Sequence, residues 1–217
     1  MRYGVLGTGE VGRTIAGKLV ALGHEVTLGS RTKDNAAALA WAQEAGPGGH
    51  NGTFADAAAF GEVVVNATGG MVSLYALEAA GAANLAGKLL VDVANPLSFA
   101  DGELVLDPVG SDSLGERIQR AYPQARVVKT LNTVNSAVMV DPSRVPGEHV
   151  LFLSGDDAAA KEQTAALLAE FGWPGERVVD LGGITSARGT EAFLLLWVKT
   201  MGALGHADFN FALHRAH

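Results

Sequence analysis

The sequence contains no cysteine, and this absence removes several kinds of chemistry at once. Without a thiol, the chain has no disulfide, no thiolate metal site, no iron–sulfur cluster and no cysteine nucleophile. Basic residues are also few: 16 Lys and Arg stand against 23 Asp and Glu, for a formal net charge of -7 and a pI near 5.3. Binding to nucleic acid needs clustered basic residues, so we expect no nucleic-acid partner.

A long hydrophobic segment is missing as well. The longest apolar run near the C-terminus extends from Ala192 to Val198 and stops at Lys199, well short of the roughly 20 residues that a membrane helix requires. We therefore expect a buried or interface helix here, and no membrane partner. Because Met1 leads almost directly into an apolar segment without the pattern of a secretory signal, we expect a cytoplasmic protein.

Several common catalytic motifs are absent. None of the three tyrosines has a lysine four residues later, and no Gly-x-Ser-x-Gly elbow occurs. The histidines of the C-terminal tail, His206, His214 and His217, lack carboxylates at metal-ligand spacing, which predicts a frayed tail and no metal site. Lys129, at the end of a predicted strand, is a candidate proton donor, but a structural or solvent-facing role is favoured.

The sequence does contain a regular alternation of short apolar runs and helix-forming stretches. This pattern is typical of an α/β protein with βαβ units, in which a doubly wound, mainly parallel Rossmann sheet is covered on both faces. The predicted strands are 2–6, 25–28, 62–67, 88–94, 126–130, 149–153 and 177–180, with a weaker one at 52–54. The predicted helices are 11–22, 35–45, 72–85, 113–121, 158–171 and 186–204.

Residues 46–52 and 101–111 are predicted to be loops, and neither is long enough to be a domain linker. We expect a single domain over residues 1–217, since this length suits one sizeable α/β core. Residues 184–217 are expected to form a C-terminal helical appendage, which would be the natural interface of a homodimer.

A glycine-rich turn, Gly7-Thr8-Gly9-Glu10-Val11-Gly12, follows the first predicted strand and opens the first helix. In this context Gly7 allows a tight turn, Gly9 lets the backbone approach a pyrophosphate, and Gly12 lets the helix pack closely on the sheet. The free N–H groups at the helix start would then face the anion. Glu10 is unusual here, because a carboxylate beside a pyrophosphate is unfavourable unless it points toward solvent or ribose.

The end of the second strand predicts which dinucleotide is bound. An Asp or Glu that would bind the ribose 2′-hydroxyl of NAD is missing, and Ser30, Arg31 and Lys33 stand there instead. A hydroxyl and two cations suit a 2′-phosphate, which favours NADP. The alternative is that Arg31 and Lys33 only begin a solvated helix face, and Asp34 could weaken the positive field.

Several segments together resemble the NADP oxidoreductases that use the 8-hydroxy-5-deazaflavin coenzyme F420. The similarity covers nearly the whole chain and rests on GTGEVG, LGSRTK, DVANP, VVKTLNTVNS, LSGDD and DLGGITSARGTEAF. The Gly-Ser-Arg step, the late Ser-Ala-Arg and Glu191 are its more specific elements. The chain departs from the pattern at Glu10, where family members can carry Asn, and it lacks an additional Gly that they can have in the first turn.

The resemblance implies that NADP lies along the strand ends and that the deazaflavin stacks on its nicotinamide. By position, Thr8, Ser30, Arg31 and Lys33 would hold the 2′-phosphate, while Val134 and Ser136 would border the nicotinamide and the partner ring. Hydride would pass between C5 of the deazaflavin and C4 of the nicotinamide, so the protein need only align two rings and no catalytic residue is expected.

The complete set of expected cofactor-binding residues is Gly7, Thr8, Gly9, Glu10, Val11, Gly12, Ser30, Arg31, Lys33, Ala67, Thr68, Ala94, Asn95, Val134 and Ser136. Candidate walls for the second substrate are Met71, Pro96, Leu97 and Trp197, although ordinary core packing would explain each of them. Two other functions stay open: an NADPH-dependent reductase of a flavin or of a small carbonyl or imine, and a non-catalytic module that senses NADP.

Overall fold

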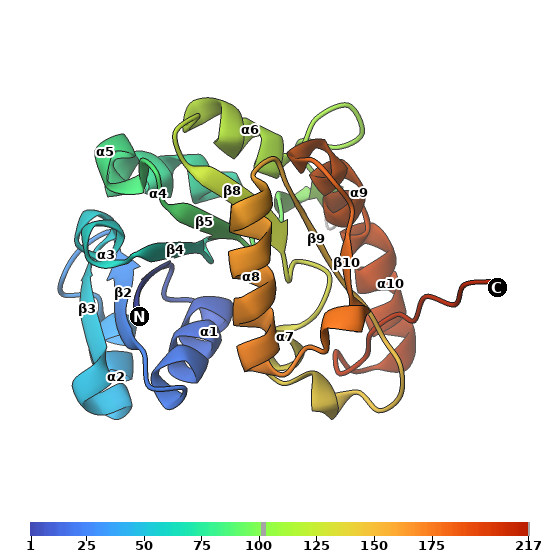
Figure 1. Ribbon diagram of the computed structural model, residues 1–217, viewed down its shortest axis with the longest axis horizontal. Coiled ribbons are helices and arrows are strands. Elements are labelled where there is room, and N and C mark those ends of the chain that lie inside the picture. The colour runs from blue at the N-terminus through green and yellow to red at the C-terminus, as the bar shows by residue number, and fades with distance from the viewer. Residues whose placement is uncertain (101–102, 217) are drawn as a thin grey trace.

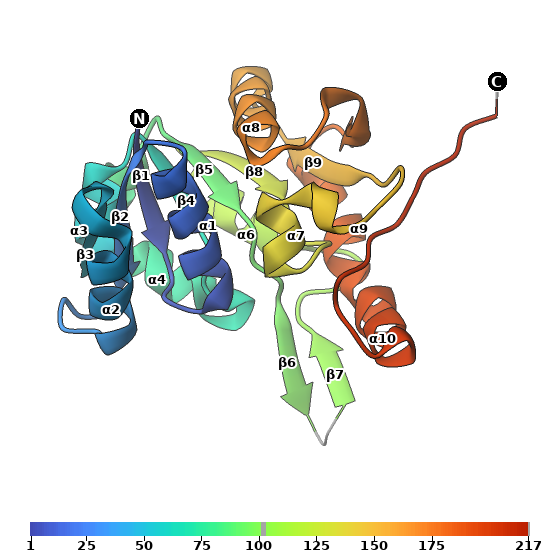
Figure 2. The same cartoon turned by 90° about the horizontal axis from the view of Figure 1, so that it is seen from below.

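The computed structural model describes residues 1–100 and 103–216 and is built around one eight-stranded sheet (Figure 1). In chain order, its strands are β1 (Arg2–Leu6), β2 (Glu25–Ser30), β3 (Gly49–Thr53), β4 (Val63–Asn66), β5 (Leu89–Asp92), β8 (Arg126–Thr130), β9 (Leu151–Gly155) and β10 (Val178–Asp180). A separate hairpin consists of β6 (Leu97–Ala100) and β7 (Glu103–Leu106). Figure 2 shows this hairpin extending away from the sheet.

The strands lie in the order β10-β9-β8-β5-β4-β1-β2-β3, and those from β8 to β3 are parallel. β9 runs antiparallel to β8, and β10 runs parallel to β9. The fold is therefore a doubly wound Rossmann sheet, as the sequence predicts. Its strand order reverses between β1 and β4, and in open α/β sheets ligands bind in the crevice outside the carboxyl ends of the strands at such a point.

Helices cover both faces of the sheet. One face carries α1 (Glu10–Ala21), α2 (Ala36–Ala45), α7 (Ser136–Val140) and α8 (Ala158–Phe171). The other carries α3 (Phe54–Phe60), α4 (Ser73–Ala80), α5 (Ala82–Leu85), α6 (Leu114–Ala121) and α9 (Ala187–Ala192). Successive residues of β4 alternate between the two cores, with Val63 and Val65 in the first and Val64 in the second. Both faces of the strand are buried, which explains its continuous apolar run.

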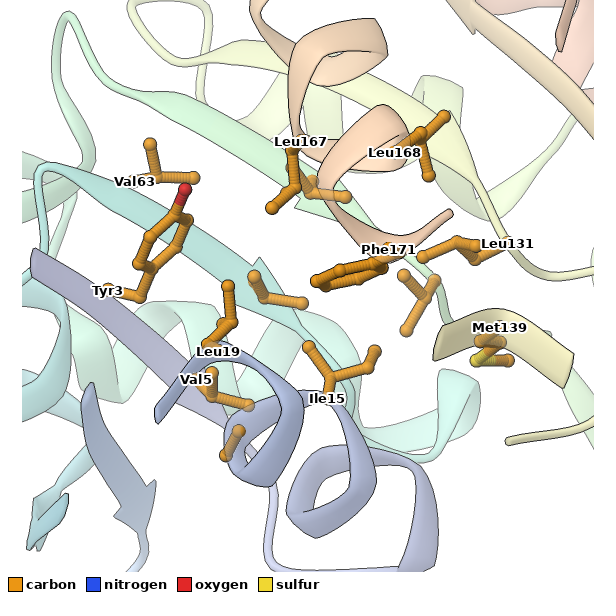
Figure 3. Packing of buried hydrophobic residues seen from close by; sticks show 14 of the residues in the cluster. Tyr3, Val5, Ile15, Leu19, Val63, Leu131, Met139, Leu167, Leu168 and Phe171 are labelled. Atoms are coloured by element: carbon orange, nitrogen blue, oxygen red, sulfur yellow. The ribbon is translucent and has the colours of Figure 1, made fainter. Parts of the chain in front are cut away.

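Figure 3 shows the first of these cores, in which β1, α1 and α8 meet. Ile15 and Leu19 of α1 face Phe171 and Leu167 of α8 above the strands, and all four side chains are buried. This packing holds α1 and α8 together on one face of the sheet.

On the opposite face, α3 packs unusually close to the sheet because glycine occupies two strand positions. A Cβ at Gly4 of β1 would lie 2.1 Å from the Ala57 carbonyl oxygen, and one at Gly29 of β2 would lie 2.8 Å from the Ala57 Cβ. Such distances leave no room for a side chain. The two glycines therefore permit α3 to lie against β1 and β2.

The structure corrects both predicted loops. Residues 46–52 contain a short helical turn and most of β3, which pairs with β2 although its sequence, GHNGT, is polar and glycine-rich. Residues 101–111 contain β7, while Asp101 and Gly102 lie outside the described residues. β3 was predicted only in part, by the weaker strand at 52–54, because its sequence is polar. β7 was not predicted, since it is only four residues long and is defined by its antiparallel pairing with β6.

Helix boundaries also differ from the sequence prediction. The helix predicted at 72–85 is divided by Gly81, whose φ of 89° ends α4 before α5 begins. The helix predicted at 186–204 is divided at Phe193 into α9 and α10 (Leu194–Leu204). Helices α3 and α7 were not predicted, because each is only a turn or two long.

The C-terminal segment contains the expected helices, α9 and α10, followed by a tail without a helix. After α10 ends at Leu204, the described residues 205–216 follow the surface without a helix. Phe209 anchors this tail by stacking on Trp197 with ring centroids 5.3 Å apart, and His217 lies outside the described residues. Within residues 1–100 and 103–216, no helix is long and apolar enough to cross a membrane.

Candidate cofactor-binding cleft

The glycine-rich turn connects β1 to α1 at the point where the strand order reverses. Gly7 adopts a φ of 113°, and its N–H donates to the Gly29 carbonyl at 2.9 Å. A Cβ at Gly7 would lie 2.5 Å from the Ala67 carbonyl oxygen, and one at Gly12 would lie 1.9 Å from that of Gly7. A Cβ at Gly9 would meet no atom within 4 Å. Gly7 and Gly12 therefore have no room for a side chain, whereas Gly9 borders open space.

The N-terminus of α1 faces the same space. Among the described residues, no side chain caps its first turn, so the first N–H groups of the helix are free to bind an anion. Arg13 donates from Nη1 to the Thr8 carbonyl at 2.6 Å and so stabilises the glycine-rich turn.

One compartment of the cleft, of about 510 Å³, lies on the β2 side of the turn. It is lined by Gly7, Thr8, Gly9, Ser30, Arg31, Asn35, Phe54, Ala67, Thr68, Gly69, Val72, Tyr75 and Ala76. Ser30 is buried and donates its hydroxyl to the Thr32 carbonyl, whereas the Arg31 side chain is exposed. This compartment combines a cation and a hydroxyl with an aromatic wall.

Lys33 has a different position from that expected. It does not line this compartment in the described chain, and its Nζ lies 3.3 Å from Asp56 Oδ2 in an exposed ion pair. Hydrogen bonds from the backbone and side chain of Thr53 hold the pKa of Asp56 below its usual value, with a smaller contribution from Lys33. The charged form of Asp56 is therefore favoured, and it already pairs with Lys33.

A second compartment, of about 470 Å³, lies on the other side of the turn over the ends of β4, β5 and β8. It is lined by Glu10, Val11, Ala67, Thr68, Gly69, Gly70, Val93, Ala94, Asn95, Leu97, Asn132, Val134, Asn135, Ser136, Met139, Leu194, Trp197 and Ala207. Ala67, Thr68 and Gly69 line both compartments, so the two adjoin. In the described chain Glu10 is the single ionisable residue of this lining.

Two pairs of polar side chains in the lining of the second compartment hydrogen-bond to each other. Ser136 donates its hydroxyl to Glu10 Oε1 at 2.5 Å and joins the start of α7 to the start of α1. Asn95 and Asn132 hydrogen-bond to each other, with the Asn95 amide donating to the Asn132 carbonyl at 2.8 Å and the Asn132 amide donating to Asn95 Oδ1 at 3.0 Å. These pairs fix the walls of the compartment relative to one another.

Beneath this compartment lies a buried ion cluster. Lys129 Nζ is 2.8 Å from Asp92 Oδ2 and 2.8 Å from Glu191 Oε1, and it also donates to the Ala94 carbonyl. All three charged side chains are buried. Burial lowers the pKa of Lys129, but the two adjacent carboxylates outweigh that penalty and hold it above the usual value. Lys129 is thus structural and neither solvent-facing nor positioned as a proton donor in the cleft.

The cluster extends to both sides through hydrogen bonds. Glu191 accepts the Leu114 and Gly115 N–H groups at 2.8 and 3.0 Å and so satisfies the first turn of α6. Asp92 Oδ1 accepts from the Ala94 N–H at 3.2 Å and from Asn66 Nδ2 at 2.8 Å.

Asn66 links the buried ion cluster to the cleft by hydrogen bonds. Its Oδ1 accepts from the Thr68 hydroxyl at 2.7 Å, and its Nδ2 donates to Ser73 Oγ at 3.1 Å. Thr68 and Ser73 also hydrogen-bond to each other at 2.9 Å. The position of Thr68, which lines both compartments, is therefore tied to the buried cluster.

Comparisons with known proteins agree with this architecture. A family model described as NADP oxidoreductase coenzyme F420-dependent matches residues 2–96. A candidate F420-dependent NADP reductase from Arthrobacter sp. FB24 is 55% identical, with a TM-score of 0.92 and 99% coverage of both chains. The chain belongs to the coenzyme F420-dependent NADP oxidoreductase family. NADP is therefore the cofactor of its class, as the glycine turn and the missing acid predict.

Two further similarities extend beyond this family. Metalloreductase STEAP3 of Rattus norvegicus is 30% identical over 210 residues, covering 94% of this chain but 39% of the metalloreductase. An imine reductase from Aspergillus terreus in complex with NADPH4 and dibenz[c,e]azepine is 19% identical, with a TM-score of 0.67, 93% of this chain covered and 62% of the other. The latter likeness supports the fold alone.

The residues of this F420-dependent-type oxidoreductase fit a dinucleotide. The space that a Cβ of Gly9 would enter is open, and the uncapped start of α1 adjoins it. The two adjoining compartments, of about 510 and 470 Å³, lie on either side of this turn. Of the expected cofactor residues, the structure places in the two linings Gly7, Thr8, Gly9, Glu10, Val11, Ser30, Arg31, Ala67, Thr68, Ala94, Asn95, Val134 and Ser136.

Other expected residues lie outside the linings. Gly12 packs against the Gly7 carbonyl, and Lys33 pairs with Asp56. Of the candidate substrate walls, Leu97 and Trp197 line the second compartment. Met71 lies outside that lining and is half-exposed. Pro96, just before β6, is buried, and its carbonyl accepts the Asp107 N–H.

The sequence analysis missed several lining residues of this family member, including Asn35, Tyr75 and Asn132. Asn132 is the second residue after β8, so the rule that ligands bind at carboxyl strand ends could have indicated it. Asn35 was included only as the start of a predicted helix, and the structure shows that its side chain caps α2. Tyr75 reaches the cleft from α4, and no local signal identifies it.

We predict that Lys129→Met lowers the free energy of unfolding by about 3–5 kcal/mol at pH 7, because it leaves Asp92 and Glu191 buried without their cation. Urea unfolding followed by circular dichroism measures the change. In the variant a carboxyl group would have a raised pKa and would take up a proton on folding, so the deficit should shrink as the pH falls from 7 to 5.

Lys161→Met provides the matched control, because Lys161 pairs with the half-exposed Asp180 at 2.8 Å on the surface. It should cost less than about 1 kcal/mol. Equal losses of stability in the two variants would contradict the structural importance assigned to the buried cluster.

Proposed function

We propose that this chain transfers hydride between NADP(H) and a planar redox coenzyme, such as the 8-hydroxy-5-deazaflavin coenzyme F420. The observation that carries the proposal is the second compartment, which adjoins the phosphate-binding turn and has largely neutral walls. Val93, Leu97, Val134 and Trp197 contribute apolar surface, and in the described chain only Glu10 is ionisable. Such a site suits the alignment of two rings more than proton transfer to a substrate.

In this proposal the residues of the chain bind and orient. The turn and the start of α1 hold the pyrophosphate, while Thr8, Ser30 and Arg31 hold the 2′-phosphate. Val134 and Ser136 border the nicotinamide, and Leu97 and Trp197 are walls for the second ring. When bound, the nicotinamide supplies the hydride-transfer chemistry itself.

An alternative acceptor is a flavin or a small carbonyl or imine. All of these acceptors, like the deazaflavin, gain a proton as well as a hydride. A carbonyl or imine needs that proton at the atom next to the reacting carbon, and the described lining offers only Glu10 for that purpose. Glu10 has a carboxylate that already accepts from Ser136. These contacts favour a planar ring as acceptor, because its reduced form spreads the negative charge over the ring and can take its proton from water.

The proposal is tested by following NADPH absorbance without oxygen in the presence of coenzyme F420, FMN or a cyclic imine. We expect NADPH oxidation with coenzyme F420 and little with the imine. Turnover with FMN or the imine alone would contradict the proposed acceptor. Tight NADPH binding without oxidation by any acceptor would instead support a non-catalytic NADP-sensing module.

We expect Arg31→Ala to raise the NADPH KM about tenfold or more and to leave the NADH KM nearly unchanged. A charge-assisted contact with the 2′-phosphate contributes about 1.5–3 kcal/mol, and NADH lacks that phosphate. Steady-state kinetics with both nucleotides measures the effect. Lys33→Ala is the comparison variant and should have less effect, because Asp56 already pairs with Lys33. Equal losses for NADPH and NADH would refute the role of Arg31.

We also propose that the chain forms a homodimer through α10. Leu195 and Leu196 are 42% and 53% exposed on this helix, and Leu204 at its end is 51% exposed. Leu196→Lys should lower the dimer fraction measured by light scattering, because it would bury a charge in the interface. Leu39→Lys, at a position of α2 that is 46% exposed, should leave it unchanged. A monomeric wild-type protein would refute the proposal.

A further inference from the structure

Glu10 has a position that the general requirements of NADP binding do not explain. A carboxylate in the phosphate-binding turn repels the pyrophosphate, whichever oxidation state the nicotinamide has. Yet the structure holds this carboxylate in place, since Ser136 donates to Glu10 Oε1 at 2.5 Å and is itself only 8% exposed. The contact crosses from α1 to α7 at the edge of the second compartment.

The charge of Glu10 has no compensating cation in that lining. Within the described chain the other lining residues are apolar or neutral. Arg13, on the next turn of α1, directs its guanidinium to the Thr8 carbonyl instead. The buried cluster of Lys129, Asp92 and Glu191 lies beneath Ala94 and adds no positive charge to the site, because its two carboxylates outnumber its one cation.

Glu10 is exposed as a residue, but the one formal charge of the described lining is negative and lies in the compartment proposed for the nicotinamide. The oxidised nicotinamide ring carries a positive charge, whereas the reduced ring is neutral. A nearby carboxylate attracts the first and has little effect on the second. Because NADP+ and NADPH share the same pyrophosphate and 2′-phosphate, the repulsion between these groups and Glu10 cancels when the two affinities are compared.

We propose that Glu10, oriented by Ser136, determines selectivity for the oxidation state and favours NADP+ over NADPH. This inference rests on the proposed function, since it requires the nicotinamide to occupy the second compartment. Tighter binding of NADP+ relative to NADPH makes the bound reduced cofactor a stronger hydride donor. Glu10 would thus bias the protein toward passing hydride from NADPH to its acceptor.

The test is to measure dissociation constants for NADP+ and NADPH by isothermal titration calorimetry and to compare their ratio among variants. Glu10→Gln should raise the ratio Kd(NADP+)/Kd(NADPH) roughly fivefold, the size expected when one partly screened charge is removed from the same compartment as a cation. Glu10→Asp keeps the charge and should stay within about twofold of the wild type. Ser136→Ala, which frees the carboxylate, should raise the ratio less than Glu10→Gln does.

Glu25→Gln is the matched control, because it removes the same charge from an exposed residue at the amino end of β2, the opposite edge of the sheet. Its ratio should equal that of the wild type. An unchanged ratio in Glu10→Gln, with tight binding of both nucleotides retained, would overturn the inference and leave the proposed function intact. Failure of the wild type to bind either nucleotide would overturn both.

Discussion

The buried contact of Lys129 with Asp92 and Glu191 connects more parts of this structure than any other interaction described above. It joins β8, β5 and α9, and through Glu191 it satisfies the free N–H groups at the start of α6. Three charges out of water are costly unless each is paired and hydrogen-bonded. Here every member has such partners. The cluster can therefore hold elements that are far apart in sequence in one arrangement.

That arrangement determines the shape of the cleft. Asp92 accepts from the Ala94 N–H and Lys129 donates to the Ala94 carbonyl, so the segment that follows β5 is fixed from below. Through Asn66 the same network reaches Thr68, which borders both compartments. A polar network whose members all have partners makes these walls rigid.

The two compartments differ in charge, so the two ends of the cleft suit different parts of a ligand. The side with Ser30 and Arg31 offers a cation and a hydroxyl, while the side with Val134 and Trp197 is nearly neutral apart from Glu10. In the function proposed above, phosphate binding and ring alignment are assigned to opposite ends of one cleft. The tail beyond α10 forms part of the second compartment, because Ala207 lines that compartment. The Asn135 side chain also donates to Asp208 of the tail at 2.9 Å. The C-terminal segment therefore contributes to the site although its residues carry no recognisable motif.

Sequence alone predicted the Rossmann sheet, the phosphate-binding turn and NADP, because each depends on local signals. Apolar runs define strands buried on both faces, and Gly7, Gly9 and Gly12 meet steric requirements that apply within a few residues. Only the tertiary structure decided that Glu10 meets Ser136, that Lys33 is engaged by Asp56, and that Lys129 lies between two carboxylates. These contacts join residues 23 to 126 positions apart, and the packing of helices on the sheet brings them together. Their geometry is a property of the folded chain, which no local pattern of residues contains.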